Sequence, residues 1–154
     1  MSFFNQILIA RKITNKLSVQ VAPSLSHQNA VNGYYTKNDS TGTATFKEMK
    51  FDHFAIALSA RYKLTNVTSI MVNYDQPLTK HATNNPSPNL SFGLEFNTSS
   101  HSFQLFVGNY FNLNQQQNNL YNTNSPFGYT DNNNTKVKGG NFLIGFNITR
   151  LWNY

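Results

Sequence analysis

Seven stretches of this chain alternate between large apolar residues and small or polar residues with a period of two. In residues 53–64, for example, Phe54 and Leu58 fall on one side of an extended chain and Arg61 falls on the other. Successive side chains of a β-strand point to opposite faces, so this rhythm predicts strands with one apolar face. The stretches are residues 5–13, 17–26, 53–64, 68–76, 89–97, 101–108 and 139–154.

The connections between these stretches alternate in length. Short turns fall at 14–16, 65–67 and about 99–100, whereas the connections at 28–51, 77–88 and 112–138 are long and polar. In an antiparallel meander all short turns then lie at one end and all long loops at the other, as in outer-membrane barrels. Strands of about 9–11 residues cross a bilayer when tilted. We therefore expect one all-β domain over residues 1–154, an antiparallel up-and-down transmembrane β-barrel in the outer membrane of a Gram-negative cell.

The apolar faces carry aromatic residues near the strand ends, which is typical of a membrane-interface girdle. The predicted girdle at the short-turn end is Tyr62, Phe96, Phe103, Trp152 and Tyr154. A soluble, lipocalin-like barrel that binds a small ligand has the same period-two pattern with the apolar face turned inward. That fold stays an alternative at this point.

An odd strand number has a consequence for the N-terminus. Bacterial single-chain barrels have an even number of strands, with both ends in the periplasm. The segment before Lys12 also lacks the charge order of a signal peptide. We expect at least one further strand before Met1, in a barrel of about ten to fourteen strands.

Composition excludes several classes of function. The net charge is +6, but the twelve basic residues are scattered and form no run, so we expect no nucleic-acid partner. The absence of cysteine excludes disulfides and thiolate metal sites. The four histidines have no paired spacing. We therefore expect neither a metal nor a cofactor.

Charged and amide residues gather on the polar faces near the short-turn end. This predicted lumen charge cluster consists of Lys12, Arg61, Lys63, Glu95 and Gln104. The 99–100 turn places Glu95 opposite Gln104. The cluster is either a selectivity zone that favours anionic solutes or a set of internal ion pairs that fills a narrow barrel. Small barrels are usually filled, which favours the second interpretation.

An enzyme is the second class of function. His53 and Asp75 fall on the polar faces of neighbouring strands near the long-loop end, where a hydrolase could use them as a general-base pair. No nucleophile or oxyanion-stabilising group accompanies them. We therefore expect no enzymatic activity, with an outer-membrane hydrolase as an alternative.

Asparagine is unusually abundant, with twenty-four residues that cluster in the long loops. Aromatic residues stand among these amides at Tyr34, Tyr35, Tyr121, Phe127 and Tyr129. Such surfaces suit carbohydrate or protein contacts. A mobile, solvated loop is the interpretation that the Asn-rich composition favours.

Four segments carry a resemblance to a known family, in the same order from about Gln6 to Trp152. They are ILIARKITNKLSVQVAPSLSHQN, DHFAIALSARYKLT, HSFQLFVGN and FLIGFNITRLW. The chain resembles the C-terminal portion of an uncharacterised family of β-barrel outer-membrane proteins from Bacteroidota. The resemblance implies an outer-membrane location and no known activity.

The end of the chain is similar to the C-terminal signal that outer-membrane assembly machinery recognises. Its residues here are Phe146, Ile148, Trp152 and Tyr154. The expected partners are thus the lipid bilayer, the assembly machinery and other outer-membrane subunits. The expected function is of the structural or passive-transport type, with a polar, partly charged lumen and long Asn-rich extracellular loops.

Overall fold

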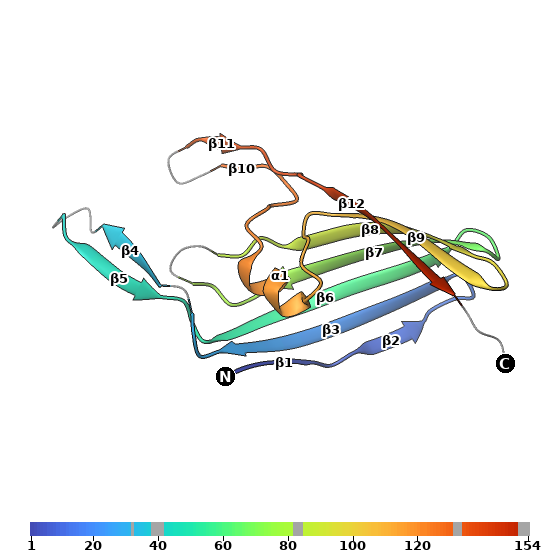
Figure 1. Ribbon diagram of the computed structural model, residues 1–154, viewed down its shortest axis with the longest axis horizontal. Helices are drawn as coiled ribbons and strands as arrows, with labels where there is room; N and C mark the ends of the chain where they lie inside the picture. The colour runs from blue at the N-terminus through green and yellow to red at the C-terminus, as the bar shows by residue number, and fades with distance from the viewer. Residues whose placement is uncertain (32, 38–41, 82–84, 131–133, 151–154) are drawn as a thin grey trace.

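The computed structural model describes residues 1–31, 33–37, 42–81, 85–130 and 134–150 of the 154-residue chain. One antiparallel sheet dominates it, and its strands follow the chain order without a crossover (Figure 1). The strands of this sheet are β1 (Ser2–Gln6), β2 (Ile9–Lys12), β3 (Leu17–Gln28), β6 (Asp52–Lys63), β7 (Thr68–Pro77), β8 (Asn89–Asn97), β9 (His101–Gly108) and β12 (Leu143–Arg150). The seven predicted strands are confirmed, with β1 and β2 sharing the first.

A proline explains why the first strand is divided. β1 and β2 pair with β3 in one continuous register, from Ser2 opposite Gln28 to Lys12 opposite Ser18. Between them the Ile7 N–H donates to the Pro23 carbonyl at 3.1 Å. Pro23 has no N–H with which to complete that pair. The ladder therefore loses one bond at Pro23 without a shift in register.

Threonine begins each of the three short turns. The Thr14 hydroxyl accepts hydrogen bonds from the backbone N–H groups of Lys16 and Leu17, and Thr65 accepts them from Val67 and Thr68 in the same way. Thr98 accepts one from the His101 N–H at 3.0 Å. Such side-chain-to-backbone bonds stabilise tight turns, and they satisfy backbone donors at the strand ends.

The long connections contain elements that the period-two pattern did not predict. The first carries a hairpin of β4 (Gly33–Lys37) and β5 (Ala44–Glu48). The third carries helix α1 (Gln115–Tyr121) and a two-residue pair of β10 (Tyr129–Thr130) and β11 (Lys136–Val137). Within the described residues, no helix is both long and apolar enough to span a bilayer.

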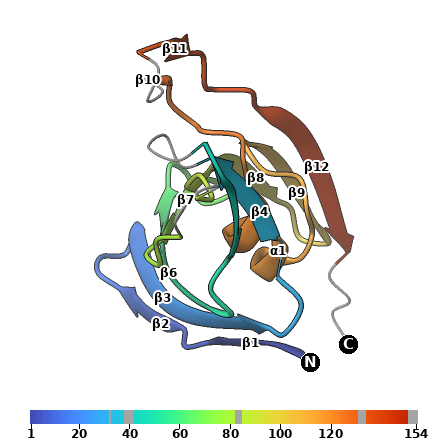
Figure 2. The same ribbon diagram turned by 90° about the vertical axis from the view of Figure 1, so that its left-hand side faces the viewer.

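The sheet curls into a half-barrel, and α1 lies inside its concave side (Figure 2). The convex side carries the large apolar side chains, and they are exposed. They include Phe54, Leu58, Tyr62, Ile70, Phe92, Leu94, Phe96, Phe103, Leu105, Ile144, Phe146 and Ile148. In a soluble lipocalin-like barrel these side chains fill the interior. Here they point outward, so the soluble alternative is wrong.

The interior is polar. Its fully buried larger side chains are His53, Asn89, Asn109, Asn119, Ser26 and Ser69. Soluble domains bury apolar side chains and expose polar ones, so this distribution is inverted. A polar lumen and an apolar outer band are the arrangement of a transmembrane β-barrel.

The two edges of the sheet are β1 and β12, and the gap of the half-barrel lies between them. Because neighbouring strands are antiparallel and five strands lie between the two edges, β1 and β12 run in the same direction, from the long-loop end to the short-turn end (Figure 1). Antiparallel closure therefore needs an odd number of additional strands. The expected further strand before Met1 stays a prediction.

Candidate functional site

An ion pair occupies the lumen near the short-turn end. Arg61 Nη2 lies 2.5 Å from Glu95 Oε1, and the Arg61 Nε–H donates to the same oxygen at 3.2 Å. The Gln104 amide donates to Glu95 Oε2 at 3.0 Å, and the Asn97 amide donates to Oε1 at 2.8 Å. Glu95 is thus satisfied by four N–H groups, as a largely buried carboxylate requires.

The strand registers explain which members of the predicted lumen charge cluster meet. Glu95 lies opposite Gln104 on β9, as the short turn predicted. Arg61 reaches Glu95 across the intervening strand β7. Lys12 and Lys63 are exposed, and in the described part of the chain neither makes an ion pair. The structure therefore joins three of the five residues.

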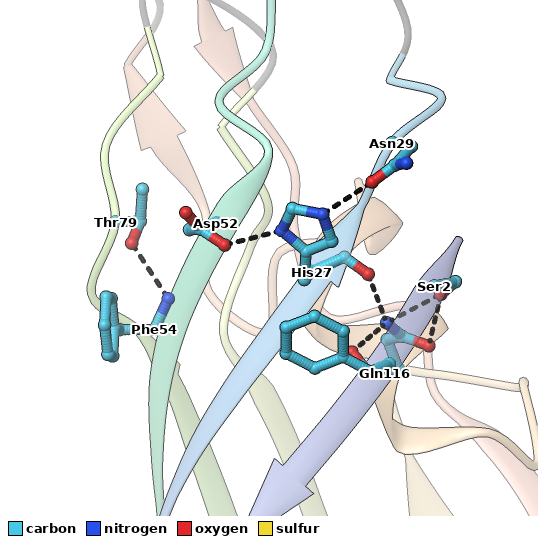
Figure 3. Close-up of polar contacts among 8 residues, drawn as sticks. Ser2, His27, Asn29, Asp52, Phe54, Thr79 and Gln116 are labelled. Atoms are coloured by element: carbon cyan, nitrogen blue, oxygen red, sulfur yellow. Dashed lines mark hydrogen bonds and ion pairs between the residues drawn. The ribbon is translucent and has the colours of Figure 1, made fainter.

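Helix α1 enters the lumen at the long-loop end and is tied to four strands. Asn114 caps it, accepting the Gln116 N–H at 2.9 Å. The Gln116 amide donates to Ser2 Oγ at 3.2 Å and to the backbone carbonyl of Phe3 at 3.0 Å, next to His27 (Figure 3). These bonds join α1 to the edge strand β1.

Further hydrogen bonds join α1 to β3 and β7. The Tyr121 hydroxyl donates to Gln28 Oε1 at the end of β3. The Gln115 amide donates to Asp75 Oδ2 on β7 at 3.3 Å. The helix is held by polar contacts because the lumen wall that it meets is itself polar.

Asparagine amides build the contact between α1 and β8. The Asn89 amide donates to Asn119 at 2.8 Å, and the Asn122 amide donates to Asn89 at 2.8 Å. Asn109 and Asn124 exchange bonds with each other's backbone carbonyls at 2.6 and 2.8 Å. A side-chain amide both donates and accepts, so Asn89 bridges Asn119 and Asn122.

This folded stretch differs from the expected mobile, solvated loop. Gln116, Asn118, Asn119 and Leu120 of α1 are buried. An Asn-rich segment orders here because the sheet supplies a partner for its amides. Sequence reasoning missed the helix because its residues lack an apolar 3.6-residue period, and the Asn114 cap was the available local signal.

Two histidines connect strand β6 with the long connections on either side of it, at the same long-loop end as α1. The Lys50 backbone N–H donates to His81 Nδ1 at 3.1 Å, and His81 Nε2 lies 3.3 Å from His53 Nδ1. His81 Nδ1 accepts, so its Nε2–H donates to His53. His81 lies outside the strands, and burial, with the nearby Lys50 charge, lowers its pKa.

The proposed general-base pair of His53 and Asp75 is not formed. Asp75 lies opposite Ala57, four residues along β6 from His53, a separation of about 13 Å. His53 bonds to His81, and Asp75 bonds to Asn73 and Gln115. Both His53 and Asp75 lie on the inner faces of neighbouring strands near the long-loop end, as the sequence indicated, but the β6–β7 pairing holds them too far apart to form a pair.

Three of the five aromatic residues predicted for the interface girdle lie in the described part of the chain and are exposed, namely Tyr62, Phe96 and Phe103. Phe96 and Phe103 face each other across β8 and β9, and Tyr62 lies at the same end of β6. Phe146 and Ile148 point outward from β12, with Phe146 77% exposed. Trp152 and Tyr154 lie outside the described residues.

At the opposite end, Phe3 stacks on His27 with ring centroids 4.8 Å apart. His27 Nδ1 lies 2.7 Å from Asp52 Oδ1 on the neighbouring strand (Figure 3). This stacked His–Asp contact lies at the long-loop end of the sheet.

Among the described residues, no group of three or more His, Cys, Asp and Glu side chains could hold a metal ion. No curated protein and no solved structure matches the chain. One family does match, over residues 1–152, and its description is a membrane-bound β-barrel domain (DUF5777). The exposed apolar convex side and the polar lumen agree with that description, and the chain belongs to this family of membrane-bound β-barrel domains.

Proposed function

We propose that the chain is an outer-membrane β-barrel protein of the structural or passive-transport type, without catalytic activity. Its short turns would face the periplasm and its long Asn-rich loops the cell exterior. A Bacteroidota origin, which the sequence resemblance implies, belongs to the same proposal. The observation that supports an outer-membrane barrel is the inverted distribution of side chains, with apolar residues outside and polar residues inside.

The position of α1 supports a closed resting state. The helix occupies the lumen at the long-loop end and bonds to β1, β3, β7 and β8. Near the short-turn end the Arg61–Glu95 pair lies on the polar, lumen-facing side of the sheet. Both sets of contacts favour a filled barrel that anchors loops or partners over a permanently open pore.

Planar-bilayer recording of the full-length protein tests this function. The expected result is insertion with few or no conductance steps. Replacing residues 115–121 by a Gly/Ser segment of equal length is expected to produce steps, because the helix no longer fills the lumen. Large, steady channels in the unaltered protein would reject the closed state, and monodisperse folding without detergent would reject the membrane orientation.

We further propose that β12 is the strand that outer-membrane assembly machinery recognises. Phe146 and Ile148 are exposed on its outward face and lie at the edge of the sheet. Substituting Phe146→Ser is expected to slow assembly into outer membranes, measured by heat-modifiable migration over time. The matched variant Phe92→Ser, on the central strand β8, is expected to assemble at a normal initial rate. Equal delays in both variants would contradict this role.

A further inference from the structure

A polar cavity of about 240 Å³ lies beneath α1, between the helix and the inner faces of the strands. Its wall includes Gln6, Gln20, Asn73, Asp75, Tyr110 and Gln115. These residues come from β1, β3, β7, α1 and the segment after β9. Pockets for drug-sized ligands are about 300–1,000 Å³, so this cavity suits a ligand of about a dozen non-hydrogen atoms.

Small residues on the sheet leave this space open. Asp75 lies opposite Ala57, and Ala57 lies opposite Ala22 on β3. Both alanines point into the barrel and are buried. On another wall, the Tyr110 hydroxyl lies 3.0 Å from Ser91 Oγ, which fixes the ring. The cavity is therefore shaped by strands and does not depend on a loop alone.

Asp75 is the one charged residue of the wall, and it is 3% exposed. Its Oδ1 accepts from the Asn73 amide at 3.0 Å, and its Oδ2 accepts from the Gln115 amide at 3.3 Å. The Asn89 side chain adds a further amide contact. A carboxylate has about four acceptor positions, so these three amides leave one for a ligand.

The wall chemistry selects among ligand classes. An anion is disfavoured by the unneutralised Asp75 carboxylate. A metal cation uses oxygen acceptors alone, and it would leave the amide N–H groups of the wall without partners. A hydroxyl group donates and accepts at once, as a side-chain amide does. Neighbouring hydroxyls therefore match this wall best.

We propose that the cavity binds a small, neutral polyhydroxylated molecule of monosaccharide size, with Asp75 accepting hydrogen bonds from its hydroxyl groups. Gln20 and Asn73 extend the polar wall along β3 and β7, and Tyr110 supplies an aromatic wall. This site goes beyond the structural or passive-transport function, because it requires neither conductance nor a partner protein.

Isothermal titration of the detergent-solubilised full-length protein with D-glucose, and separately with myo-inositol, tests the site. Saturable binding of at least one of them is expected. Asp75→Asn is expected to weaken it about tenfold or more, because the substitution replaces one acceptor oxygen by a donor and removes the charge. The matched control is Asp52→Asn, whose carboxylate lies at the long-loop end of the sheet beside His27, and it is expected to bind as the unaltered protein does.

Two variants that change only the size of a side chain test the site without altering Asp75. Ala57→Leu fills the cavity and is expected to abolish binding, whereas Ala60→Leu, on the outward face of the same strand, is expected to leave it unchanged. Heat-modifiable migration checks that each variant folds, and Gln20→Ala replaces any that does not, since Gln20 lines the cavity on β3. The proposal is overturned if neither probe binds up to 50 mM, or if Asp75→Asn binds as well as the unaltered protein. It is also overturned if sodium or ammonium binds at Asp75 and neither probe does.

Discussion

Arg61 on β6 and Glu95 on β8 meet across the strand between them, with Arg61 Nη2 2.5 Å from Glu95 Oε1. Glu95→Ala leaves the amides of Gln104 and Asn97 without their acceptor as well. We expect Glu95→Ala to lower the free energy of unfolding in urea by about 1–3 kcal/mol.

Arg61→Ala is expected to cost less, about 1 kcal/mol, because Arg61 is partly exposed and Glu95 keeps its two amide donors. Lys63→Ala is the control, since it makes no ion pair in the described chain, and its effect should stay within about 0.5 kcal/mol. Equal costs for Arg61→Ala and Lys63→Ala would contradict the assignment of the pair.

Gln116 ties helix α1 to the edge of the sheet. Gln116→Ala removes the amide that donates to Ser2 and Phe3. We expect faster hydrogen exchange across residues 113–124 and the appearance of conductance steps in planar bilayers. Gln117→Ala alters a neighbouring glutamine for which no such contact is found in the described structure, so it should change neither. If both variants exchange alike, Gln116 is not the anchor.

His81 makes stability depend on pH. Because burial lowers its folded-state pKa below the reference value of 6.5, the unfolded chain binds more protons than the folded chain in the interval between the two pKa values. The stability that neutral His81 contributes is therefore present above pH 6.5 and lost as the pH falls below it. We expect the thermal midpoint to fall from pH 7.5 to pH 5.

His81→Asn keeps an acceptor near the Lys50 N–H but cannot titrate in this range. Its thermal midpoint should fall less than that of the unaltered protein over the same pH interval, whereas His101→Asn, at the short-turn end, should follow the unaltered protein. If the thermal midpoints of His81→Asn and of the unaltered protein fall equally with pH, His81 is not the source of the pH dependence.

Gly145 on β12 gives space to the ring of Phe106. A Cβ at Gly145 would lie 2.5 Å from two carbons of that ring. Gly145→Ala is therefore expected to lower the free energy of unfolding by about 1–3 kcal/mol. Phe106→Leu in the same chain should recover part of the loss. Gly93→Ala should cost less, because the nearest atom to its Cβ would be the flexible end of Met71 at 3.3 Å; a larger cost there would contradict the steric explanation.

Much of the sheet was predictable from local pattern. Period two in residues 53–64 placed Leu58 outward and Arg61 inward, and both positions agree with the structure. The short turn after Asn97 set the pairing of Glu95 with Gln104. A hairpin turn of fixed length leaves one register, so these neighbours follow from the sequence.

The contents of the lumen were not predictable in this way. Gln116 bonds to Ser2, 114 residues away, and Asn119 bonds to Asn89, 30 residues away. Nothing in the period or spacing of an amide-rich stretch says which distant strand will supply its partners. Likewise, Arg61 rather than Lys63 pairs with Glu95, although Lys63 and Glu95 both lie opposite Ser69 in the strand register.

Local sequence pattern specifies the strands, their order and the apolar convex face, because each depends on neighbours along the chain or across one short turn. The fold of the whole sheet places α1 in the lumen, brings His53 to His81 rather than to Asp75, and leaves a polar cavity beneath the helix. Those features depend on how the sheet curls, and the curl brings together side chains whose spacing along the chain carries no trace of the contact.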